Sequence, residues 1–100
     1  MKTKEEVRVQ LGQIVATPGA LEAFERNNTN GFGFIQRHSI GDWGEICAED
    51  KEANYAALES GARLMSAYSL GDGTKIWVIT EAKGDQGKRQ ATTLLLPEEY

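Results

Sequence analysis

Apolar and polar residues alternate through the last forty residues of the chain with the two-residue period of β-strands. The pattern predicts three strands, at residues 63–70, 74–82 and 91–96. The first two flank Gly71-Asp72-Gly73, a sequence typical of a tight hairpin turn. A charged, glycine-bearing loop at residues 83–90 precedes the third. The C-terminal part is therefore expected to form an antiparallel meander.

The first sixty residues carry helix signals instead. Thr17-Pro18 is typical of an N-cap followed by proline in the first turn, and it predicts a helix to about residue 26 with Leu21 and Phe24 facing inward. For residues 32–38 the pattern is consistent with either a short helix or an irregular segment, and the helix is favoured. Before these, β-branched residues at 7–16 favour an N-terminal strand.

A longer helix is expected at residues 49–60, which are rich in Ala, Glu, Leu and Lys. Acidic residues lie in its first turn, and Gly61 stands where a left-handed C-cap residue is expected. Its apolar stripe is predicted to contain Ala53, Ala56 and Ala57.

Together these elements predict one α+β domain over residues 1–100, with N-terminal helices packed on a C-terminal antiparallel meander of three to four strands. The N-terminal strand is the optional member of this fold. In the middle strand, Ile76 and Val78 share one face while Trp77 and Ile79 share the other. Helices are expected to cover one face, and the other face is expected to be partly covered or to meet a partner.

Charge and composition limit the class of binding partner and the cellular compartment that the sequence predicts. The net charge of −4 gives no overall attraction to nucleic acid or to an anionic membrane, so a protein partner is favoured, a second copy of the chain included. No apolar run approaches the roughly 20 residues that span a bilayer. The single Cys47 and the polar first residues favour a reducing cytoplasm.

The segment from Arg37 to Glu45 holds the densest group of candidate site residues. His38 is the only histidine and therefore the natural general acid or base, although a histidine that caps a helix end is the favoured interpretation. Asp42 and Trp43 lie between two glycines, where a structural turn is favoured over a carboxylate that orients His38. Both residues are candidates for binding.

Polar residues on the predicted strands form a second candidate group, which includes Ser66, Thr80, Glu81 and Thr93. They could converge on one face, but cross-strand pairing explains most polar strand residues. The catalytic candidates are His38, Arg63, Tyr68 and Thr92, and the binding candidates are Asp42, Trp43, Trp77 and Arg89.

No cofactor is expected. One histidine and one cysteine cannot build the usual zinc site, and the chain has no phosphate-binding loop or dinucleotide fingerprint. Gly31-Phe32-Gly33 is only a fragment of such patterns. Cys47 is equally consistent with a small buried side chain and with a nucleophile.

The most specific sequence blocks are Gly41-Asp42-Trp43-Gly44 and Thr92-Thr93-Leu94-Leu95-Leu96-Pro97-Glu98-Glu99-Tyr100. With matching blocks at residues 11–21, 37–38, 66–68 and 76–82, the chain resembles a family of small proteins from bacterial plasmids, integrated elements and gene cassettes, often labelled plasmid-related proteins. The resemblance covers nearly the whole chain and implies residence on mobile DNA, not an activity. The chain departs from the family at residues 27–33 and 83–90, and Arg89 is matched to an arginine of the family.

A second resemblance concerns the layout alone. Helices before an antiparallel meander, with a histidine ahead of the sheet, are similar to small bacterial ribonuclease toxins of the barnase and RelE type. This resemblance implies that His38 moves a proton while Arg63 or Arg89 stabilises the phosphorane and Tyr68, Ser66 or Thr92 positions the phosphate. The favoured hypothesis is a non-enzymatic protein-binding module of a mobile element, and the alternative is a small ribonuclease.

Overall fold

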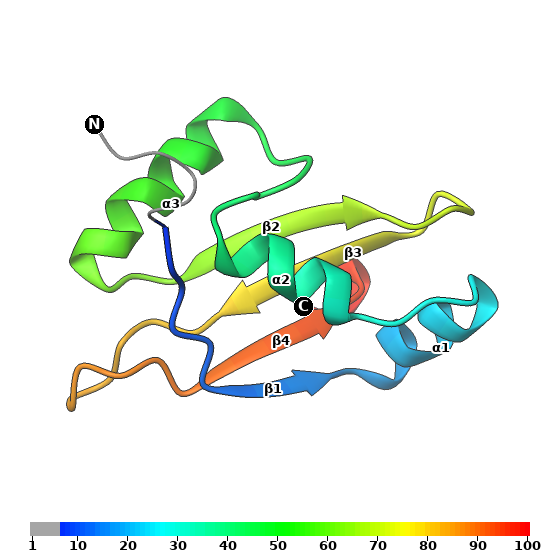
Figure 1. Cartoon of the computed structure of the whole chain (residues 1–100), viewed down its shortest axis with the longest axis horizontal. Coiled ribbons are helices and arrows are strands. Elements are labelled where there is room, and N and C mark those ends of the chain that lie inside the picture. Colours follow the sequence, from blue (N-terminus) through cyan, green and yellow to red (C-terminus); the bar gives the residue numbers. More distant parts are fainter. Residues whose placement is uncertain (1–6) are drawn as a thin grey trace.

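A computed structural model describes residues 7–100 as a four-stranded sheet with helices on one side (Figure 1). The strand order is β1-β4-β3-β2. Helix α2 crosses in front of the central strands, α1 lies at one end of the sheet, and α3 packs against β2. The elements in chain order are β1 (Gln13–Ala16), α1 (Pro18–Arg26), α2 (Phe32–Ser39), α3 (Ala48–Ser60), β2 (Leu64–Ser69), β3 (Lys75–Thr80), β4 (Ala91–Leu95) and a short 3-10 turn (Pro97–Glu99).

The α+β class is confirmed, but the expectation of a purely antiparallel sheet is wrong. Strands β2, β3 and β4 form the antiparallel meander, whereas β1 runs parallel to β4. The helices also lie between β1 and β2 in the sequence instead of preceding the sheet. A parallel neighbour cannot be reached by a tight turn, so the chain crosses the sheet between β1 and β4, and the helices form part of that crossing.

The predicted hairpin between β2 and β3 is present. Its turn is held by a hydrogen bond from the Leu70 N–H to the Thr74 carbonyl at 2.8 Å and one from the Gly73 N–H to the Leu70 carbonyl at 2.9 Å. The Asp72 carboxylate accepts a further bond from the Thr74 N–H at 2.9 Å. All three strands of the meander fall within the predicted segments.

The N-terminal strand is shorter than the predicted range 7–16. Strand β1 begins only at Gln13, directly after Gly12, which has a φ of +64°. A Cβ at this position would collide with the backbone of Arg89 and Gln90. The chain therefore needs glycine to turn into the sheet here, because a left-handed conformation and a close backbone approach coincide.

The helices form largely where the caps predict them. The Thr17 hydroxyl accepts the Ala20 N–H at 3.1 Å to start α1, and left-handed Gly61 ends α3. Residues 32–39, left open by their sequence pattern, are helical. No helix in the described part of the chain is long and apolar enough to cross a membrane.

Two predicted helix faces are only partly confirmed. Leu21 was expected to face inward, but it is exposed while Phe24 on the same helix is buried. On α3, Ala53 and Ala56 are exposed, and the buried positions are Asn54 and Ala57. Phe24 and Ala57 are therefore buried as predicted, whereas Leu21, Ala53 and Ala56 face outward.

Two clusters of buried side chains hold the layers together. The larger lies between the sheet and α1 and α2, and contains Phe24, Ile35, Tyr68, Ile76, Val78 and Leu94. The smaller gathers between α3 and β2 around Trp43, Ala57 and Leu64. The opposite face of the sheet is partly covered by the C-terminal residues, since the Tyr100 ring contacts the Trp77 ring with 5.8 Å between centroids.

The outer edge of β2 is closed by groups that are not strands. The Asn54 side chain accepts the Met65 N–H at 3.1 Å and donates to the Met65 carbonyl at 2.8 Å, so its amide substitutes for a neighbouring strand. Further along, the Trp43 carbonyl and the Glu45 N–H bond to Ala67 at 3.1 and 2.7 Å. Gly44 permits this approach, because a Cβ there would collide with the Ala67 carbonyl oxygen.

Candidate functional site

His38 lies at the centre of a buried polar network beneath α2. Its Nδ1 is 2.6 Å from the Ser66 hydroxyl, and its Nε2 is 2.8 Å from the Thr80 hydroxyl. The Thr80 hydroxyl is in turn 2.7 Å from that of Thr92. All four side chains have no exposed surface. Ser66 and Thr80 therefore meet His38 directly and Thr92 meets it through Thr80, so the ring does not cap the carbonyls of a helix end, which was the interpretation favoured from the sequence.

The direction of every hydrogen bond in this network follows from the bond that Thr92 makes at the end away from Ser66. The Thr92 hydroxyl donates to the Leu11 carbonyl at 2.8 Å, so it can only accept from Thr80. Thr80 has then used its proton and must accept from the Nε2–H of His38. His38 is consequently the neutral Nε2–H tautomer, and its Nδ1 accepts the Ser66 proton.

Burial reinforces the neutral form of His38. Desolvation, with a smaller contribution from the positive charge of Arg89, lowers the pKa of His38 to about 4. Both ring nitrogens are occupied, and the Trp43 ring lies edge-on to the imidazole with 5.6 Å between centroids. The ring can exchange a proton with a bound molecule only after the surrounding structure opens.

The remaining catalytic candidates do not gather around His38. Arg63 is exposed, and its guanidinium lies 5.2 Å from the centroid of the Tyr100 ring, on the opposite face of the sheet. The Tyr68 hydroxyl donates to the Asp42 carbonyl at 2.6 Å, and burial raises the pKa of Tyr68 to about 12. Tyr68 therefore remains protonated and engaged in the fold at neutral pH.

The binding candidates Asp42 and Trp43 hold the turn that leads from α2 towards α3. The Asp42 carboxylate forms an ion pair with Arg37 at 2.7 Å and accepts the Gly44 N–H at 3.3 Å. Trp43 is buried, and its Nε1 has no hydrogen-bond partner among the described residues. The other tryptophan candidate, Trp77, is half-buried against Tyr100.

Arg89 is buried and holds the loop at residues 83–90 against the end of α3. Its guanidinium donates to the carbonyls of Ala62 at 2.6 Å, of Ala57 at 3.0 Å and of Glu81 at 3.0 Å. Desolvation lowers the pKa of Arg89. The Ala57 carbonyl lies in the last turn of α3 and also accepts the Gly61 N–H, so Arg89 adds a second donor there and links the helix end to residues 62 and 81. The geometry of Arg89 therefore serves the fold.

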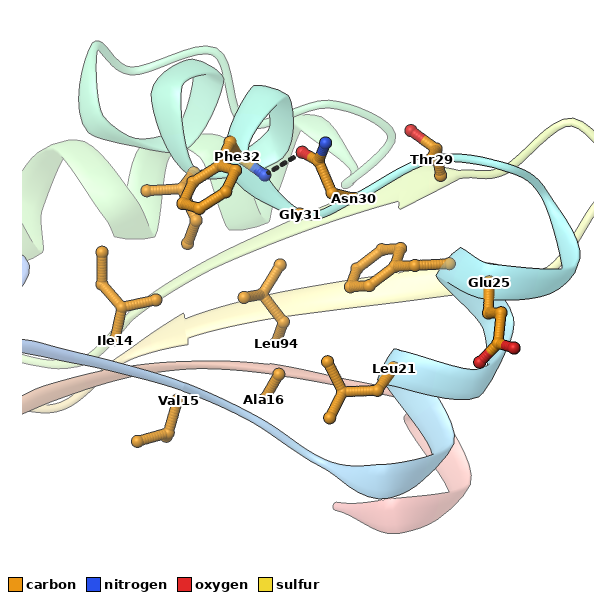
Figure 2. Close-up of a pocket in the computed structure, with 12 residues that line it drawn as sticks. Ile14, Val15, Ala16, Leu21, Glu25, Thr29, Asn30, Gly31, Phe32 and Leu94 are labelled. Atoms are coloured by element: carbon orange, nitrogen blue, oxygen red, sulfur yellow. Dashed lines mark hydrogen bonds between the residues drawn. The ribbon is translucent and has the colours of Figure 1, made fainter.

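An apolar hollow of about 580 Å³ opens between β1, α1 and α2 (Figure 2). Ile14, Leu21 and Phe32 border a common space, with Leu94 between them and Val15 pointing away. These three bordering side chains are 45%, 57% and 74% exposed. The polar groups in its wall come from Glu25, Thr29 and Asn30. The apolar hollow is therefore a hydrophobic surface with a few polar groups at one side.

The outer edge of β1, which pairs with no other strand among residues 7–100, borders the apolar hollow. The N–H groups of Gln13 and Thr17 point inward, because they donate to the carbonyls of Gln90 and Leu94 at 2.9 and 3.0 Å. Backbone groups alternate in direction along a strand, so those of Ile14 and Ala16 point out of the sheet. An apolar hollow and a row of hydrogen-bonding groups therefore lie side by side.

Sequence reasoning did not identify this surface. Leu21 was assigned to the interior and Phe32 to an unsettled segment, because a helix pattern shows which residues are apolar but not which face meets the sheet. The sequence did contain one signal of it, because α1 has more large apolar residues than its contact with the sheet can bury. Helix α1 offers Leu21 and Phe24 to a narrow contact that buries only Phe24.

The described residues contain no group of His, Cys, Asp and Glu side chains that could hold a metal ion. Comparisons of the chain with models of protein families, with curated proteins and with solved structures gave no match. The geometry of the surface and of the buried network is therefore the evidence on function.

Proposed function

We propose that this chain is a non-enzymatic protein-binding module that uses the apolar hollow as its binding surface. The observation that carries the proposal is the grouping of Ile14, Leu21 and Phe32, all exposed, around one concave space. Single exposed apolar residues are ordinary, but a group of them around a hollow is typical of a docking site. The net charge of −4 favours a protein over a nucleic acid as partner.

Residence on bacterial mobile DNA is part of the proposal, and it rests on the resemblance of Gly41-Asp42-Trp43-Gly44 and residues 92–100 to the plasmid-related family. In the fold, these blocks perform structural tasks. Gly44 allows the backbone of Trp43 and Glu45 to close the edge of β2, and the Thr92 hydroxyl ties the buried network to the Leu11 carbonyl. The blocks therefore support kinship in fold, while the apolar hollow supports binding.

The ribonuclease alternative gains no support from this geometry. General acid-base catalysis needs a group within hydrogen-bond reach of the substrate and with a pKa near the working pH. His38 is fully buried, is bonded at both nitrogens and has a pKa of about 4. Of the two cations proposed to stabilise a phosphorane, Arg63 lies on the other face of the sheet, and the guanidinium of Arg89 is buried and bonded to three backbone carbonyls.

Site-specific photo-crosslinking tests the binding function. A photoreactive phenylalanine analogue placed at Phe32 in cells that carry the gene should yield a discrete adduct with another protein. The matched control is the same analogue at Tyr55, an exposed aromatic position on α3 that does not line the apolar hollow.

A Leu21→Glu substitution in the same experiment should abolish the Phe32 adduct, because it places a charge at the rim of the apolar hollow. The proposal fails if Phe32 gives no adduct. It fails equally if Phe32 and Tyr55 give the same adducts, because the contact would then not depend on the apolar hollow.

A further inference from the structure

We infer that the apolar hollow and the open edge of β1 together bind an extended peptide segment of a partner protein by strand addition. The inference rests on the proposed binding function and specifies its chemistry. The segment pairs with the outward backbone groups of Ile14 and Ala16 and inserts one large apolar side chain into the apolar hollow. A basic residue beside that side chain meets Glu25.

The two edges of the sheet differ in a way that favours strand addition at β1. The β2 edge is occupied by the Asn54 amide and by the backbone of residues 43–45. Proteins commonly protect such edges with charged residues or proline, yet β1 consists of Gln13, Ile14, Val15 and Ala16. No strand in the described part of the chain pairs with its outward groups, and they are therefore suited to pair with a fifth strand.

The geometry of strand pairing directs a side chain of the added strand towards the apolar hollow. Residues directly opposite each other in neighbouring strands point to the same face of a sheet. Ile14 and Ala16 line the apolar hollow from the helix-covered face, so a residue opposite either of them would point to that side. A volume of about 580 Å³ lies within the range of pockets that enclose large side chains or small ligands.

The charge of the Glu25 carboxylate favours a peptide that carries a basic residue. Arg26 on α1 is already paired with Glu22 at 3.4 Å and Asp72 at 3.8 Å. Glu25 lines the apolar hollow and has no ion-pair partner among the described residues. A peptide with Lys or Arg beside its apolar anchor complements this carboxylate, whereas a second copy of the chain brings β1, which has no basic residue, and a second Glu25.

Binding of synthetic peptides by fluorescence anisotropy tests the inference directly. The probes are four labelled hexapeptides, Lys-Thr-X-Thr-Val-Lys, in which X is Val, Leu, Phe or Trp. At least one should bind the wild-type chain, and Leu21→Glu should weaken its binding at least about tenfold, the loss expected when an apolar contact becomes a buried charge. Absence of binding by all four at about 1 mM overturns the inference.

A charge exchange tests the role of Glu25. Glu25→Lys should weaken the best peptide about three- to tenfold and strengthen a version with both Lys residues replaced by Glu. The control Glu52→Lys, at an exposed position on α3, changes the net charge equally and should leave both affinities within about twofold. If Glu52→Lys reproduces the effect of Glu25→Lys, the local pairing is wrong.

Methylation of peptide nitrogens separates strand addition from simple insertion of a side chain. In an added strand, alternate N–H groups face β1, so methylating that set should abolish binding while methylating the other set should not. If the peptide still binds with either set of nitrogens methylated, but not to Leu21→Glu, strand addition is overturned. The binding function tested by crosslinking would still stand. A dimer at pH 7 that Leu21→Glu dissociates would instead assign the surface to a second copy.

Discussion

At the scale of single residues, the hydroxyls of Thr80 and Thr92 determine how His38 is accommodated. Thr80→Val keeps the shape of the side chain but leaves the His38 Nε2–H without an acceptor, and Thr92→Val leaves the Leu11 carbonyl without its donor. Each change should lower the free energy of unfolding by about 1–3 kcal/mol. Urea denaturation followed by circular dichroism measures the loss.

The paired substitution makes the test specific to the network. Thr80 and Thr92 bond to each other, so the double variant should lose less stability than the sum of the single losses. The control is Thr93→Val, at the next position of β4 with its side chain on the other face of the sheet. Additive losses at positions 80 and 92 would show that the hydroxyls act independently.

The lowered pKa of His38 predicts a particular dependence of stability on pH. The folded chain keeps His38 neutral to about pH 4, whereas the unfolded chain protonates it near 6.5, so the unfolded state binds more protons between these values. Stability should therefore fall as the pH decreases through this window, by about 3 kcal/mol from this group.

His38→Gln isolates that contribution, because carboxylates also titrate towards the acid end of the window. The variant should be less stable at pH 7, yet lose less stability than the wild type between pH 6.5 and 4. Because the chain has a single histidine, its ring proton resonance in NMR reports the same event directly. Titration of that resonance near pH 6.5 in the folded chain would contradict the assignment.

The polar strand group predicted from the sequence contained Ser66, Thr80 and Thr92, but it also contained residues that lie outside the network, Arg63 among them. Ser66 and Tyr68 were grouped with Arg63, although strand alternation places Arg63 on the face opposite to theirs. Thr80 and Thr92 meet because β3 and β4 pair at that register. Alternation predicts faces within one strand, whereas registers between strands depend on turns and packing that no single segment encodes.

At the scale of elements, α3 acts on the sheet through Asn54. Asn54→Ala removes both bonds to the Met65 backbone, and should lower the free energy of unfolding by about 1–3 kcal/mol. Hydrogen exchange should accelerate more at the Met65 amide than at the Ala67 amide, which bonds to the Trp43 carbonyl. Glu52→Ala, on the same helix, serves as the control, and equal acceleration at both amides would indicate general loosening of β2.

The elements themselves were largely predictable, because caps and turns are local signals. Thr17 and Gly61 determine where α1 begins and α3 ends, and Gly71-Asp72-Gly73 places the hairpin. The parallel pairing of β1 with β4 was not predictable, because a strand only four residues long carries no mark of its direction or neighbour. The buried Asn54 was missed for a related reason, since its partner is the backbone of another element.

At the scale of the whole molecule, the net charge of −4 opposes contact between copies at pH 7, and this repulsion vanishes near the pI of about 5.0. The surface most prone to contact is the one that combines the apolar hollow with the unpaired edge of β1. Light scattering should therefore show association of the wild-type chain as the pH falls towards 5.0.

Two lysine substitutions locate the surface responsible. Ile14→Lys puts a charge on β1 beside the apolar hollow, while Tyr55→Lys changes the charge equally on α3. Association should be weaker in Ile14→Lys than in Tyr55→Lys at their common pI. Loss of His38-dependent stability occurs over the same pH range, so circular dichroism must show that both variants remain folded. Equal association of the two folded variants would mean that another surface drives contact between copies. The apolar hollow and the edge of β1 would then not be the surface most prone to self-association.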